Sequence, residues 1–305
     1  MYIIFLYLIS AVITLTQNIT AKFTSNALVG RPTSAYAMFT LTSGIISCLF
    51  YWIMNGFKIN ATPTVILFSL GFTLALCLSN IGILTVYRFL NVANVLVILS
   101  SSQLIMISLA GALFFKEEIT VLKVIKILIM LMCIFLSFID TKKREAPDKT
   151  GTKINVSASK VVITVILLLI TMTANSSITV LNKFYTISNN VTDEESYLFF
   201  GNLFMVFISA AILLCAYFRS PSVGKLTFSM VKTRSFIFMI INALGGGISC
   251  LIALLIIANL DVTIATPISS AVGMIMTVMT SLILKEKIGI YSYIAVALSI
   301  LVFVI

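Results

Sequence analysis

Ten long apolar runs fill almost the whole of this 305-residue chain, and each is close to the length that crosses a lipid bilayer. A crossing helix needs about 20 mostly apolar residues, because the hydrocarbon core is about 30 Å thick. The runs lack the period-two alternation of a membrane barrel, so a helix is expected in every run. They cover 1–21, 33–55, 64–86, 92–115, 120–139, 160–182, 196–218, 235–258, 262–284 and 289–305.

The composition indicates that lipid rather than water is the main solvent. Hydrophobic residues make up 60% of the chain and charged residues 10%, whereas soluble domains have roughly 45–50% and about 25%. The net charge of +10 does not indicate a nucleic-acid partner, because the basic residues lie between apolar runs. The sequence therefore predicts an all-α, multi-pass protein of the cell (inner or plasma) membrane, with the lipid bilayer as a partner.

Two residue types limit the chemistry that the chain can perform. It contains no histidine, which removes imidazole bases and histidine metal ligands. Its five cysteines are widely spaced inside apolar runs, so neither a zinc site nor a disulfide framework is expected. A membrane-embedded enzyme would need His, Asp or metal ligands at depth, and none is visible. We therefore expect no enzymatic activity, no cofactor and no metal.

A short motif occurs twice, each time after an apolar run that contains a cluster of serines. The first copy ends in Lys116-Glu117 and the second, 169 residues later, in Lys285-Glu286. Two further pairs repeat in the same order: Lys22-Phe23 with Lys183-Phe184, and Ser79 with Ser249. Three ordered matches indicate that the two halves of the chain are copies.

A basic polar segment at 141–159 separates the copies into 1–140 and 160–305, with five apolar runs each. Because five is odd, the second copy must enter the membrane from the opposite side. The sequence thus predicts ten transmembrane helices in two inverted five-helix repeats. Glu117 and Glu286 would then lie on opposite membrane faces, so the Lys-Glu turns are interpreted as caps at the interface and not as one site.

Over its whole length the chain resembles the drug/metabolite transporter superfamily, specifically its EamA type with ten helices. The resemblance rests on the apolar helix that ends in a glutamate turn, present twice, and on Pro267 ahead of the second turn. It implies a permease that moves a small organic metabolite by alternating access. The family usually has glycine before the glutamate, where this chain has Lys116 and Lys285.

The orientation is left open by two opposing arguments. Fifteen of the 20 Lys and Arg residues lie in or beside one alternating set of loops, which includes the central linker. The positive-inside rule then places both termini outside, whereas the resemblance implies that both lie in the cytoplasm.

All ten acidic residues fall at the ends of apolar runs or between them. A carboxylate at membrane depth is what a proton-coupled drug exporter or a divalent-cation permease would need, so both are disfavoured. Neutral polar groups at depth remain as candidates for the substrate pathway: Gln103, Asn175, Asn80, Ser100, Ser101, Ser269, Ser270 and Asn18, with Gly246 of a glycine triplet. Amides can donate to and accept from a polar solute, but such groups can instead join helices.

The sequence therefore predicts a transporter of a small organic metabolite. The triplet Gly245-Gly246-Gly247 is either a hinge that lines a cavity or a site of close helix packing. A divalent-cation permease of the same superfamily and a sensor or structural membrane protein without cargo remain alternatives. A monomer and a homodimer are both compatible with the sequence.

Overall fold

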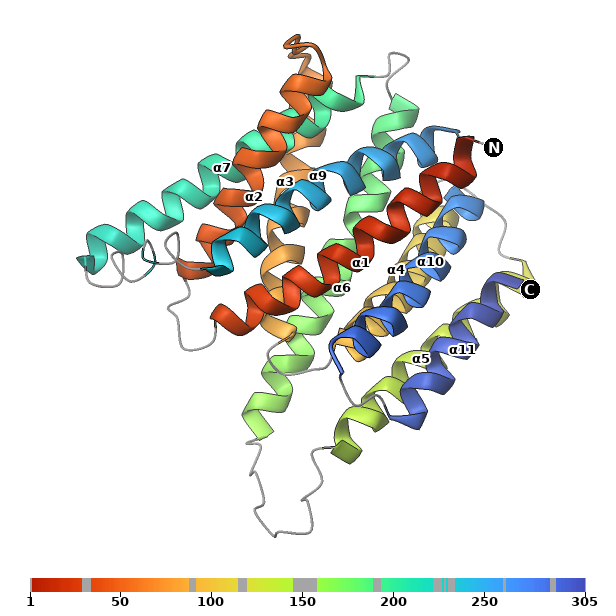
Figure 1. Ribbon diagram of the computed structural model, residues 1–305. Helices are drawn as coiled ribbons and strands as arrows, with labels where there is room; N and C mark the ends of the chain where they lie inside the picture. The colour runs from red at the N-terminus through yellow and green to blue at the C-terminus, as the bar shows by residue number, and fades with distance from the viewer. Residues whose placement is uncertain are drawn as a thin grey trace.

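The computed structural model describes residues 2–28, 34–87, 92–114, 120–144, 158–188, 193–221, 227, 229, 234–259, 262–285 and 289–304. These residues form ten long α-helices, which pack side by side and cross one another at an angle (Figure 1). The helices are α1 (Tyr2–Leu28), α2 (Ser34–Met54), α3 (Pro63–Val86), α4 (Val92–Phe114), α5 (Val121–Arg144), α6 (Ala158–Ser188), α7 (Glu194–Arg219), α9 (Arg234–Asn259), α10 (Val262–Ile283) and α11 (Ile290–Val304).

Each predicted apolar run corresponds to one helix, and most helix ends lie within two residues of the prediction. The first, fifth and sixth runs are exceptions, because α1 continues to Leu28, α5 to Arg144 and α6 to Ser188. Lysine is a good helix former, so Lys22 and Lys183 do not end α1 and α6. Lys22 instead donates from Nζ to the Tyr87 carbonyl oxygen at 3.1 Å, at the end of α3. Helix also extends into both ends of the predicted 141–159 linker, whose residues 145–157 lie outside the described residues.

Local sequence explains several helix ends. Thr62 caps α3 by accepting a hydrogen bond from the Val65 N–H, and Pro63 occupies the first helical position. Asp193 caps α7 in the same way, accepting from the Ser196 N–H at 3.0 Å. α2 ends where Gly56 and Phe57 take positive φ values of 58° and 64°, a left-handed turn that stops the helix.

Seven of the described helices are long and apolar enough to cross a membrane: α1, α2, α3, α4 from Asn94, α6 from Ile166, α7, and α9 up to Ile257. The described apolar parts of α10 and α11 are shorter, Ala271–Ile283 and Ile290–Val302. The outer faces are apolar too: Phe218 is 79% exposed and Leu67 70%. Side chains of this kind suit contact with lipid, so the chain is an all-α, multi-pass membrane protein.

The packing of the helices follows a regular plan. α2 packs on α7, α4 on α10, and α5 on α11. α3 packs on α6 and α7, while α1 and α2 both pack on α9. Pairing the first five helices in order with the last five makes α1–α9 the counterpart of α3–α6, and α2–α9 the counterpart of α3–α7. The principal contacts between the two groups of five are thus unchanged when the groups are exchanged.

Individual contacts give the helix directions. α2 and α7 are antiparallel: Thr40 bonds Ser209 at 2.7 Å, whereas eight residues further along α2, Cys48 bonds the carbonyl of Phe199, ten residues earlier on α7. α1 and α9 are also antiparallel, because Phe23 stacks on Phe238 and residues nearer the start of α1 meet residues nearer the end of α9.

Two other helix pairs are parallel and share one contact pattern. Ser47 and Tyr51 of α2 donate to the carbonyl oxygens of residues 243 and 247 of α9, at 3.5 and 2.6 Å. Ser69 and Thr73 of α3 donate to those of residues 197 and 201 of α7, at 2.8 and 2.6 Å. In both pairs, hydroxyls four residues apart meet carbonyls four residues apart. α7 therefore runs with α3 and against α2, and α9 runs with α2 and against α1.

Buried clusters close the two ends of the bundle formed by α1–α3, α6, α7 and α9. The first, here called the aromatic cluster, lies where α2 ends and α3 begins and contains Tyr51, Val65, Phe72, Tyr185, Tyr197, Leu198, Leu251 and Leu254. The second lies at the other end of α2 and contains Leu28, Ala35, Tyr36, Phe39, Leu84 and Met239. α2 spans the distance between them, so they occupy opposite ends.

Candidate functional site

Two of the predicted pathway residues, Gln103 and Asn175, take part in contacts between helices on neighbouring turns of α6. Gln103 of α4 donates from Nε2 to Thr179 Oγ1 at 2.8 Å, and both side chains are half-buried. Ser79 of α3 donates to Asn175 Oδ1 at 3.5 Å. Residues 175 and 179 are one helical turn apart, so α6 carries both contacts on one side. Three helices thus bring amides and hydroxyls together within membrane-crossing spans, and this group is here called the α6 polar cluster.

Neighbouring predicted residues lie beside this cluster without joining it by a hydrogen bond among the described residues. Asn80 follows Ser79 on α3 and is half-buried, as is Ser100 on α4. Ser101 is fully buried, and its hydroxyl has no hydrogen-bond partner within the described part of the chain. A buried hydroxyl without a partner is costly, which marks Ser101 as a polar group available to another molecule or to water.

A second polar group joins α1 to α9. Asn242 donates from Nδ2 to the Gln17 carbonyl oxygen at 3.0 Å and to Thr20 Oγ1 at 3.1 Å. The predicted residue Asn18 is buried in the same stretch of α1, and its Nδ2 has no hydrogen-bond partner among the described residues. A hydrogen-bond donor inside a membrane span that has no partner among the described residues can donate to a polar solute. This group is here called the α1–α9 polar cluster.

The glycine triplet is fully helical within α9, so the unwound hinge considered from the sequence is not what the structure shows. The triplet allows close packing instead. A Cβ on Gly245 would lie 2.9 Å from Gln17 Cγ, one on Gly246 would lie 3.5 Å from Gln17 Nε2, and one on Gly247 would lie 3.3 Å from Ser47 Oγ. The close approach brings α9 against α1 on one side and α2 on another.

The remaining predicted residues lie at and after α10. Pro267 is inside the helix, and Ser269 is exposed. Lys285 ends α10 with φ 52°, a left-handed conformation that glycine adopts most easily. The predictions for Lys116, Glu117 and Glu286, and for the side chains of Pro267 and Ser270, lie outside the described residues.

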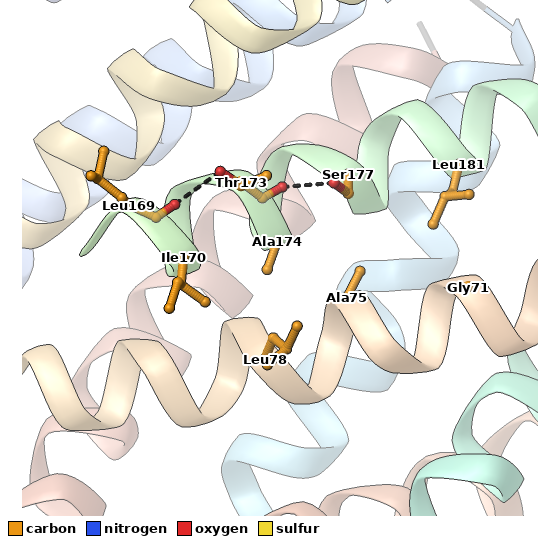
Figure 2. A pocket seen from close by; sticks show the side chains of 9 residues that line it. All are labelled: Gly71, Ala75, Leu78, Leu169, Ile170, Thr173, Ala174, Ser177 and Leu181. Atoms are coloured by element: carbon orange, nitrogen blue, oxygen red, sulfur yellow. Dashed lines mark hydrogen bonds between the residues drawn. The ribbon is translucent and has the colours of Figure 1, made fainter. Parts of the chain in front are cut away.

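A groove of about 480 Å³ lies between α3 and α6, and none of the predicted residues lines it (Figure 2). Small residues, Gly71, Ala75 and Ala174, leave the space. Its two hydroxyls, on Thr173 and Ser177, donate to carbonyls of their own helix at 2.9 and 2.8 Å. The groove therefore presents hydrocarbon, and exposed leucines flank it. It suits a lipid chain, whereas the two polar clusters suit a polar solute.

Asn242, Thr20 and Thr179 belong to these clusters but were not predicted from the sequence. Asn242 could have been found, because it is an amide inside an apolar run, the criterion that selected Gln103 and Asn175. Thr179 is one of many hydroxyl residues in apolar runs and had no distinguishing signal. Only the packing of α4 against α6 identifies it as the partner of Gln103.

No group of three or more His, Cys, Asp or Glu residues is placed to hold a metal ion in the part of the chain that the structure describes. No family model and no curated protein matches the sequence. A solved structure described as "Crystal structure of protein" is similar, with a TM-score of 0.56 and 15% identity over 96% of both chains. At this identity the likeness concerns the fold alone. It shows that a similar arrangement of helices, over nearly the whole chain, occurs in a known structure.

Proposed function

We propose that this protein is a membrane permease that moves a small organic metabolite by alternating access between two inverted five-helix repeats. The observation that carries the proposal is the exchange symmetry of the helix packing. Equivalent helices α2 and α7 are antiparallel, as a two-fold axis in the membrane plane requires. With the boundaries predicted from sequence, the repeats are 1–140 and 160–305, and all ten helices cross the membrane.

The two polar clusters support a polar, uncharged or zwitterionic cargo. α4 and α6 supply Gln103 and Asn175, and α1 and α9 supply Asn18 and Asn242. Amide groups can both donate and accept, so they can replace the hydration of hydroxyl, amide or amino-acid-like groups. Rocking of one repeat against the other would expose these clusters alternately to the two sides of the membrane.

A thermal-shift screen tests the proposal. The purified protein in detergent is heated with members of a metabolite panel, and a cargo is expected to raise its unfolding temperature because it binds the folded state. The same cargo should stabilise Gln103→Ala and Asn175→Ala much less. The matched control is Asn259→Ala, which removes an exposed amide that bonds only the Leu255 carbonyl of its own helix among the described contacts.

Reconstitution into liposomes provides the second measurement. Saturable flux of the stabilising metabolite is expected, and a continuous open pore would contradict alternating access. Equal stabilisation of the wild type and both variants would show that the α6 polar cluster is not the site. A reporter fused to the C-terminus would decide the orientation, for which the charge distribution and the family resemblance give opposite answers.

A further inference from the structure

A polar network joins the two halves of the chain at the end that carries the α2–α3 and α6–α7 connections. Asp193, at the start of α7, accepts from Asn60 Nδ2 at 2.6 Å through Oδ2 and from Asn55 Nδ2 at 3.4 Å through Oδ1. Ser196 Oγ, one turn later, accepts from the Asn60 N–H at 3.0 Å and from Asn55 Nδ2 at 3.3 Å. These four residues are here called the latch.

The latch lies directly over the aromatic cluster. Tyr185 donates from its hydroxyl to the Asp193 carbonyl oxygen at 2.9 Å, and its ring stacks on Tyr197 with centroids 4.2 Å apart. Tyr197 in turn donates to Asn182 Oδ1 at 2.9 Å. The latch therefore tops a continuous packed layer in which α2, α3 and α9 meet α6 and α7. Separation of the two halves at this end requires the latch contacts to break first.

Among the described residues, the counterpart at the opposite end is chemically different. There the start of α2 meets the α7–α9 connection through a hydrogen bond between two hydroxyls, Ser34 Oγ and Thr227 Oγ1, at 2.8 Å. The position is equivalent, because both contacts join the start of a second helix to the connection after the second helix of the other half. The latch uses a carboxylate, and hydrogen bonds to a charged group are the stronger kind.

We propose that the latch is the closed gate of its membrane face, and that its release opens this face in the transport cycle. The role of the latch in transport rests on the proposed permease function, whereas opening of the latch can be measured without any transport. The carboxylate is the central group, because Oδ1 both caps α7 and meets Asn55 while Oδ2 holds Asn60. An asparagine at 193 would keep the cap but would set its amide N–H against that of Asn60.

Two native cysteines serve as matched reporters of opening in the full-length protein. Cys48 of α2 is buried two turns before the latch residue Asn55, with Sγ on the carbonyl oxygen of Phe199 in α7. Cys133 of α5 is equally buried but lies away from the latch, with Sγ on the carbonyl oxygen of Ala295 in α11. Labelling by a charged, water-soluble maleimide, located by peptide mass spectrometry, measures opening at each.

Three variants test the latch against this readout. Asp193→Asn is expected to raise the Cys48 labelling rate about tenfold, the effect of losing a hydrogen bond to a charged group. Asn60→Asp should raise it at least as much, because two carboxylates would face each other. The double variant Asp193→Asn with Asn60→Asp reverses donor and acceptor and should restore protection. Glu195→Gln removes a neighbouring charge whose side chain makes no hydrogen bond among the described residues, so it should leave labelling unchanged.

Three results would overturn the latch. They are Cys48 labelling that stays at the wild-type rate in both single variants, a double variant that labels as fast as the single ones, and Cys133 labelling that rises in parallel with Cys48. The last would show that the whole fold had loosened. The labelling assay uses no cargo. Restored protection of Cys48 in the double variant therefore supports the latch even if the protein transports no metabolite. In that case only the permease proposal fails.

Discussion

The α1–α9 and α3–α6 seams occupy equivalent places, each joining the first helix of one group of five to the third helix of the other, yet they are filled differently. The middle of the α1–α9 seam holds polar contacts, where Asn242 bonds two groups of α1. Among the described side chains, the α3–α6 seam has one long hydrogen bond, from Ser79 to Asn175, and an apolar groove beside it. The difference shows that two seams can occupy equivalent places in the helix packing while the side chains that fill them differ in polarity.

The largest loss of stability is expected from adding a side chain where the α3–α6 seam is tightest. A Cβ on Gly82 would lie 1.9 Å from Thr171 Oγ1 and 2.9 Å from its Cβ. Thr171 is β-branched and stiff, so Gly82→Ala should destabilise the protein by about 1–3 kcal/mol. Thermal unfolding in detergent measures this. Gly273→Ala, with no atom within 4 Å of the new Cβ, is the control, and equal unfolding temperatures for the two would refute the seam packing.

A smaller effect should separate the two seams by their hydrogen bonds. Asn242→Ala removes two hydrogen bonds at 3.0 and 3.1 Å and is expected to cost about 1 kcal/mol, since interhelical bonds in membranes average about 0.6. Asn175→Ala removes one at 3.5 Å and should cost clearly less. Denaturation of both variants in the same detergent measures the two losses of stability. A loss for Asn175→Ala equal to or greater than that for Asn242→Ala would contradict the expected difference between the seams.

The smallest change in stability is expected for a substitution at Gly245. A Cβ there would lie 2.9 Å from Gln17 Cγ, but this neighbour is an unbranched side chain that can move. Gly245→Ala should therefore change stability by less than about 1 kcal/mol, because the gain in helix propensity offsets the contact. The unfolding temperature is again the measurement. A loss as large as that of Gly82→Ala would mean that the α1–α9 seam is as rigid as the α3–α6 seam.

The positions of the helices could be predicted because lipid leaves few alternatives. An uninterrupted apolar run must form a helix to satisfy its backbone groups, so run boundaries predicted helix boundaries well for α2, α3, α4 and α10. The prediction for α1 and α6 was short, because it treated Lys22 and Lys183 as helix ends. A lysine can stay in a helix when a carbonyl accepts from it, as that of Tyr87 does for Lys22.

The candidate site was predictable only in part. Amides at depth are rare enough to notice, and Gln103 and Asn175 do take part in contacts between helices. Their partners could not be predicted, since many hydroxyl residues lie in apolar runs and packing alone decides which one an amide meets. The latch gave no signal either, because Asp193, Asn55 and Asn60 lie outside the predicted apolar runs or at their ends, where polar residues are ordinary.

The sequence by itself determined the class of the protein, an all-α chain in membrane, because the length and apolarity of its runs leave helices as the only way to satisfy the backbone. It also indicated a duplication. The tertiary structure decided how the two halves meet: α3 against α6 and α7, α9 against α1 and α2, and a carboxylate latch at one end opposite a hydroxyl contact at the other. Helix-to-helix contacts depend on side chains far apart in the chain, and no local pattern encodes which of them will touch.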